Sequence, residues 1–195
     1  MHQGRIALKP LFDHFGKLAP YYEYFIRSKN TENLKTLLDL PHNALLLDAG
    51  GGTGRISQAF IDDSIRVVIA DESYKMLQEA QRKDGLQPIR TYTEGLPFKD
   101  EQFDGILMVD ALHHVADPRR STSELWRVLK PGGRIVIEEP NINLFGVKLL
   151  ALAEKLALMR SHFISPQKIV SLFHSFPAYC RVKEEDALAW IIIDK

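Results

Sequence analysis

The sequence contains little cysteine and no excess of charge of either sign, and each shortage excludes a class of protein. A single cysteine, Cys180, rules out an internal disulfide framework and a multi-cysteine zinc site, and it fits a reducing, cytoplasmic compartment. The 25 basic residues equal the 25 acidic ones, so the composition offers no electrostatic basis for wrapping nucleic acid. The seven histidines show no metal-ligand spacing, and we therefore expect no bound metal.

Long apolar runs are absent too. The most apolar region, residues 144–159, is interrupted by Lys148, Glu154 and Lys155, so no stretch reaches the ~18 apolar residues that a membrane span requires. Residues 1–6 lack the apolar run of a secretory signal. We expect a cytoplasmic protein without an integral membrane segment. The oligomeric state cannot be read from the sequence.

Short apolar runs alternate with helical patterns from residue 44 onward, and this alternation indicates the fold class. Predicted strands occupy residues 44–47, 65–70, 88–93, 103–109 and 134–138, and predicted helices occupy 53–61, 73–83 and a segment that begins at Asp117–Pro118. Such alternation is typical of parallel strands with helices on both faces of the sheet.

The last thirty residues follow a different pattern. Ser165–Pro166 predicts the start of a helix. Two β-like runs, 179–183 and 188–193, are joined by the short acidic segment 184–186, which only allows a hairpin. The expected fold is therefore an α/β, Rossmann-like, seven-stranded and mostly parallel sheet with an antiparallel last strand.

Residues 1–43 lie outside the alternating pattern. The aromatic, amphipathic segment 11–25 predicts a helical arm, so we expect one domain over residues 1–195, with an arm or lid at 1–43 and a core at 44–195. The arm and the apolar segment 144–159 would flank the ligand pocket in this topology. They could form a lid over a hydrophobic acceptor or be ordinary core.

A glycine-rich loop follows the first predicted strand. Gly50, Gly52 and Gly54 alternate with other residues after Asp48. Glycines here either let the backbone approach a ligand at a helix N-terminus or simply shape a tight turn. The dinucleotide-binding fingerprint Gly-x-Gly-x-x-Gly would require a third glycine where Arg55 stands. The loop therefore favours a class of ligand other than a dinucleotide.

At these residues the chain resembles the class I S-adenosylmethionine-dependent methyltransferases, within them the methyltransferase type 11 and ubiquinone/menaquinone C-methyltransferase-like group. The resemblance continues at 67–71, at 94–104 and at the turn 128–133, and covers about residues 44–140. It implies the strand order 3-2-1-4-5-7-6. It also implies transfer of a methyl group from S-adenosyl-L-methionine to a small, apolar molecule, with a quinone precursor as one candidate.

The resemblance places the cofactor contacts residue by residue. Asp71, at the end of the second predicted strand, would hold the two ribose hydroxyls, because a carboxylate can accept hydrogen bonds from a vicinal diol. The same acid could instead cap the following helix. Thr93 and Val109 would contribute backbone groups. The expected cofactor-binding residues are Tyr22, Asp48, Gly50, Gly52, Thr53, Asp71, Glu72, Met76, Thr93, Glu94 and Val109.

His113 is the candidate catalytic residue. It follows the fourth predicted strand at the carboxyl end of the sheet, where ligands bind in open α/β folds. His113 or the adjacent His114 could take a proton near neutral pH, or both could merely pack in a loop. The Asn/Asp-Pro-Pro-aromatic tetrad of DNA amino-methyltransferases is absent at 110–113. The remaining alternatives are a nicotinamide-dependent reductase and a non-catalytic S-adenosylmethionine-binding module.

Overall fold

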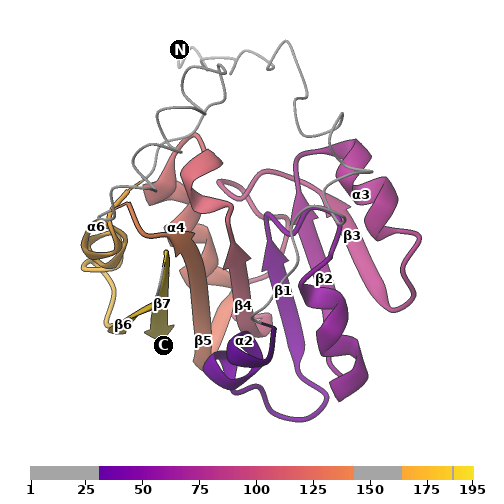
Figure 1. Cartoon of the computed structure of the whole chain (residues 1–195), viewed down its shortest axis with the longest axis horizontal. Helices are drawn as coiled ribbons and strands as arrows, with labels where there is room; N and C mark the ends of the chain where they lie inside the picture. The colour runs from indigo at the N-terminus through magenta and orange to yellow at the C-terminus, as the bar shows by residue number, and fades with distance from the viewer. Residues whose placement is uncertain (1–30, 143–163, 186) are drawn as a thin grey trace.

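A seven-stranded sheet dominates the computed structural model, which describes residues 31–142, 164–185 and 187–195 (Figure 1). Along the chain its elements are α2 (Thr31–Leu38), β1 (Leu45–Ala49), the 3₁₀ helix η1 (Ser57–Asp63), β2 (Arg66–Asp71), α3 (Tyr74–Ala80), β3 (Leu86–Arg90), β4 (Phe103–Val109), the 3₁₀ helix η2 (Leu112–His114), α4 (Pro118–Val128), β5 (Leu129–Pro140), α6 (Pro166–Ser171), β6 (Tyr179–Glu185) and β7 (Leu188–Asp194).

The strand order is β3-β2-β1-β4-β5-β7-β6, as the resemblance implied. Strands β1 to β5 pair in parallel, whereas β7 runs antiparallel to both β5 and β6. In Figure 1 the arrowheads of β1, β2 and β4 therefore point to the same end of the sheet and that of β7 points away from it. The expected fold class is confirmed.

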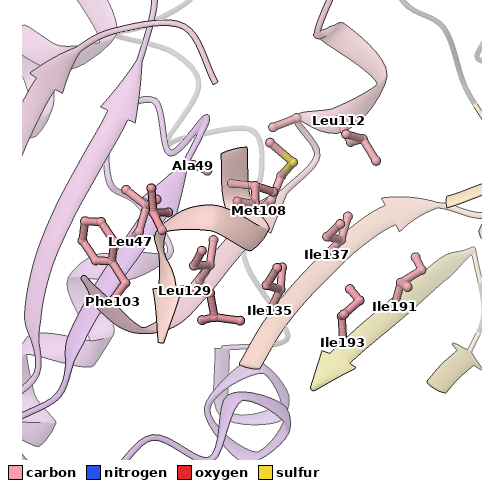
Figure 2. Packing of buried hydrophobic residues seen from close by; sticks show 14 of the residues in the cluster. Leu47, Ala49, Phe103, Met108, Leu112, Leu129, Ile135, Ile137, Ile191 and Ile193 are labelled. Carbon is pink, nitrogen blue, oxygen red and sulfur yellow. The ribbon is translucent and has the colours of Figure 1, made fainter. Parts of the chain in front are cut away.

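The central strands are largely apolar because both faces of the sheet are covered. Alternate residues point to opposite sides, so Leu46 and Leu107 join one buried cluster while Leu47 and Met108 join the other. The helices α2, η1 and α3 contribute to the first cluster and α4 and α6 to the second, part of which is shown in Figure 2. Each such side chain contributes about 1.5–3 kcal/mol by burial. These two layers fix the carboxyl ends of β1, β2, β4 and β5.

Part of the predicted arm belongs to the core. The helix α2 lies within residues 1–43, and its Leu34 and Leu38 are buried in the same cluster as Leu46. The aromatic segment 11–25 and the apolar segment 144–159 lie outside the described residues. Among the described residues, no helix is long and apolar enough to cross a membrane.

Both predicted helix caps are present. The Asp117 side chain accepts a hydrogen bond from the Arg120 amide at 3.0 Å and begins α4, and the Ser165 hydroxyl accepts one from the Lys168 amide at 3.3 Å and begins α6. In each helix a proline follows the cap, where its missing N–H costs nothing.

Several boundaries differ from the prediction. The helix expected at 53–61 is the 3₁₀ helix η1, which begins at Ser57; its buried positions Ser57 and Phe60 are three residues apart, and two turns of sequence cannot separate a period of 3.0 from one of 3.6. The helix expected at 73–83 is shorter, since α3 ends at Ala80.

Two strands also differ in extent. The strand expected at 88–93 instead spans Leu86–Arg90. It can contain Pro88 because β3 is an edge strand, where proline is tolerated. The strand expected at 134–138 is longer, since β5 starts at Leu129 and includes the Pro131–Gly133 segment, where the pairing with β4 is irregular.

Candidate active site

The glycines after β1 are required for two different reasons. Gly50, Gly52 and Gly54 all have positive φ, at +74°, +55° and +69°. A Cβ at Gly50 would lie 2.6 Å from Cβ of Ala111, and one at Gly54 would lie 2.6 Å from Cδ1 of Ile69. At these two positions the protein's own packing excludes a side chain. The sequence left open that the glycines simply shape a tight turn, and this explanation therefore accounts for Gly50 and Gly54.

Gly52 is different because few of the described residues surround it. Among them, a Cβ there would meet only Oδ2 of Asp71, at 3.9 Å. Its amide donates a hydrogen bond to the same oxygen at 2.9 Å. The position thus requires glycine for its left-handed backbone, and the space that a side chain would fill is left beside the carboxylate of Asp71.

Asp71 connects the glycine loop to the next helix. Its Oδ2 accepts from the Gly52 amide, and its Oδ1 accepts from the amide of Ser73, the N-cap residue of α3, at 2.8 Å. The helix-start role and the ligand role are therefore compatible. Each carboxylate oxygen can accept more than one hydrogen bond, so both can still receive a hydroxyl from a diol.

Asp48 is a buried carboxyl group beneath the loop. The pKa of this carboxyl group is raised to about 7, chiefly by burial. The charge of Asp71 also raises the pKa, while the Ser57 hydroxyl and the Arg55 guanidinium offset part of the rise. Oδ2 of Asp48 and Oγ1 of Thr53 are buried without a hydrogen-bond partner among the described residues. A cationic donor at Asp48 would stabilise the ionised carboxylate.

Thr93 and Glu94 contact the start of α4 and the turn before it. The Thr93 hydroxyl lies 2.8 Å from the hydroxyl of Ser121, and Oε1 of Glu94 accepts from the amides of Ala116 and Asp117 at 2.9 and 3.2 Å. Glu94 therefore has a structural role that its place in the sequence did not indicate.

The other predicted cofactor residues are placed as follows. Glu72 is exposed, and its carbonyl accepts from Nε of Arg90 at 3.0 Å. Met76 is buried on α3, and Val109 is half-buried at the end of β4. Tyr22 lies outside the described residues. The structure thus brings Asp71 and the buried Asp48 to the loop that contains Gly52.

His113 is buried in η2, with 2% of its side chain exposed. Its Nδ1 lies 2.5 Å from Oε2 of Glu139 on β5, and its ring packs on that of His114 at 3.9 Å between centroids. The opposite nitrogen, Nε2, lies 3.9 Å from Oδ1 of Asp110. Asp110 has φ +53°, an uncommon conformation for a residue other than glycine.

The sequence interpretation missed Glu139 and Asp110. Both are acids that follow or end a buried strand at the carboxyl edge of the sheet, the same signal that singled out Asp71. Asp110 adjoins Ala111, whose Cβ is the atom that excludes a side chain at Gly50, so the His113 turn lies against the glycine loop. Within the described residues, no three His, Cys, Asp or Glu side chains gather as a metal site.

Comparison with known proteins finds relatives of part of the chain. The family model described as "Methyltransferase domain" matches residues 47–137. A demethylmenaquinone methyltransferase of Clavibacter sepedonicus is 41% identical over 98 residues, which are 48% of this chain and 40% of that protein. One from Renibacterium salmoninarum is 31% identical over 155 residues, 76% of this chain and 64% of that protein. The chain thus spans between two fifths and two thirds of these relatives.

A solved structure shares the fold over nearly the whole length. An S-adenosylmethionine-dependent methyltransferase of Thermotoga maritima has a TM-score of 0.76 and 23% identity, covering 93% of this chain and 98% of that chain. The chain therefore matches the methyltransferase-domain family model over residues 47–137 and has the fold of a solved S-adenosylmethionine-dependent methyltransferase.

Proposed function

We propose that this chain transfers a methyl group from S-adenosylmethionine to a small, apolar acceptor, with a ring-hydroxylated quinone precursor as the first candidate. The position at Gly52, which is open among the described residues and lies beside Asp71, carries the proposal together with the buried carboxyl group of Asp48. The relatives named demethylmenaquinone methyltransferases supply the acceptor candidate.

The residues present fit the cofactor. Asp71 would accept hydrogen bonds from the ribose diol, and Gly52 would leave room for the nucleoside beside it. The unpartnered Oδ2 of Asp48 suits the ammonium group of the methionine portion. When bound, S-adenosylmethionine would supply an electrophilic methyl group on its sulfonium. Tyr22, Gly50, Thr53, Glu72, Met76, Thr93, Glu94 and Val109 remain proposed contacts.

The chain's own part in the reaction would be alignment and proton removal. A hydroxylated ring becomes a better carbon or oxygen nucleophile once its hydroxyl proton is removed, and His113 is the proposed base. The Nε2 side of its ring faces Asp110, whose side chain is 41% exposed, so an acceptor would approach from this side. The arm predicted at 1–43, of which residues 1–30 lie outside the described residues, remains a proposed lid that would exclude water.

Turnover is the direct test. The purified chain is incubated with methyl-labelled S-adenosylmethionine and a chemically reduced, demethylated naphthoquinone, and extracted label is counted. The proposal predicts labelled acceptor that is lost in the Gly52→Ala variant. Saturable cofactor binding with no transfer to a panel of hydroquinones and phenols would instead support a non-catalytic binding module.

A further inference from the structure

Glu139 gathers three hydrogen-bond contacts on one buried carboxylate. Its Oε1 accepts from the backbone amides of Ala111 and Leu112 at 3.1 and 2.7 Å, and its Oε2 faces Nδ1 of His113. The side chain of Glu139 is 5% exposed. One strand, β5, therefore fixes both the turn η2 and the histidine ring that this turn carries.

The arrangement decides which ring nitrogen holds a proton. Ionised carboxylate oxygens only accept hydrogen bonds, and backbone amides only donate them. With Oε1 taken by two amides, an ionised Glu139 requires a donor at Oε2, which would place the hydrogen of His113 on Nδ1. The lone pair of a neutral imidazole then resides on Nε2, which lies 3.9 Å from Asp110.

We propose that Glu139 is a positioning residue that keeps the His113 proton on Nδ1, so that Nε2 takes the proton from the acceptor hydroxyl. This inference rests on the proposed function. In the step, the acceptor O–H bond breaks, its electron pair stays on oxygen, and a new N–H bond forms at Nε2. The resulting imidazolium lies between the carboxylates of Glu139 and Asp110, which stabilise it.

The Glu139→Gln variant separates this role from a structural one. Glutamine can keep its oxygen on the Ala111 and Leu112 amides, which preserves the turn. Its NH₂ group must then face Nδ1 of His113 and donate to it, which moves the ring proton to Nε2. A purely structural carboxylate would be replaced without consequence for the histidine.

The measurement is nitrogen NMR on protein with ¹⁵N-labelled histidine, in which the His113 signals are assigned by their loss in His113→Asn. The inference predicts the Nδ1–H tautomer in the parent chain and the Nε2–H tautomer in Glu139→Gln. An Nε2–H tautomer in the parent would overturn it, and so would an unchanged tautomer in a folded variant. The parent spectrum decides even if the variant does not fold.

Glu138→Gln is the matched control. Glu138 is the preceding residue of β5, is also buried, and accepts from Nε1 of Trp190 on the other face of the sheet. This variant loses one buried carboxylate but should leave the His113 tautomer unchanged.

Kinetics add a second readout. Glu139→Gln should lower kcat by about 100-fold or more while S-adenosylmethionine affinity stays within about twofold. A flipped tautomer with unchanged kcat would also overturn the inference. If no hydroquinone is methylated, the proposed function fails, but the tautomer measurement still reports on Glu139.

Discussion

Replacement of Gly52 by alanine should weaken cofactor binding strongly while the chain still folds. An alanine there must adopt φ +55°, which costs about 1–2 kcal/mol, and among the described residues its Cβ would meet only Asp71 Oδ2 at 3.9 Å. The fold should therefore survive. The new methyl group would occupy the space proposed for the cofactor, and we expect a loss of more than ~2 kcal/mol in binding, at least about 30-fold in Kd.

Gly132→Ala is the control for backbone strain. Gly132 has φ +77°, and no atom of the described residues would lie within 4 Å of a Cβ placed there. It lies near the start of β5, at the opposite end of the sheet from the glycine loop. Both variants should lose a similar 1–2 kcal/mol (about the cost of left-handed alanine) in urea unfolding. Only Gly52→Ala should lose binding by calorimetry. A folded Gly52→Ala chain that binds S-adenosylmethionine as tightly as Gly132→Ala would refute the placement of the cofactor.

Three further variants test the surrounding groups. Gly54→Ala should destabilise the fold by about 2–5 kcal/mol in urea unfolding, because overpacking against Leu86 and Ile69 adds to the backbone strain. A loss of stability no larger than that of Gly132→Ala would contradict this packing. Asp71→Asn should lose about 1.5–3 kcal/mol of unfolding free energy as well as cofactor affinity, because the NH₂ group of the asparagine must face the backbone amide of Gly52 or Ser73. Unchanged stability would contradict the hydrogen bonds from these two amides. Since burial raises the pKa of Asp48 to about 7, the folded chain holds a proton there that the unfolded chain releases near pH 4. This group alone should therefore lower stability by about 3 kcal/mol between pH 4 and pH 7, and Asp48→Asn should remove this fall in melts across that range. An unaltered slope would contradict the raised pKa.

The sheet could be predicted because its signals are redundant. Buried parallel strands read as short apolar runs, and β4 (Phe103–Val109) matches its predicted run at both ends. The caps Asp117 and Ser165 were readable because side-chain oxygen followed by proline is a local signal. Helix type was not readable in η1, where two turns give too few positions to define a period.

The candidate site was only partly predictable for a different reason. The residue types at Asp48, Gly52 and Asp71 mark a ligand loop, but which glycines serve the ligand depends on the atoms that surround each one in space. The ring of His113 is oriented by Glu139, 26 residues later in the sequence. The connection between them exists only because β4 and β5 are neighbours, from Phe103↔Leu129 to Val109↔Glu138. Single-sequence patterns do not encode such contacts.

Parallel calorimetric titrations of the purified chain with S-adenosylmethionine and NADPH test the central claim most directly. The Gly52–Asp71 arrangement predicts saturable one-site binding of S-adenosylmethionine and of its demethylated product in the micromolar range, and no NADPH binding. NADPH should not bind because Arg55 occupies the position of the third glycine of the dinucleotide fingerprint. Saturable NADPH binding without S-adenosylmethionine binding would contradict the account.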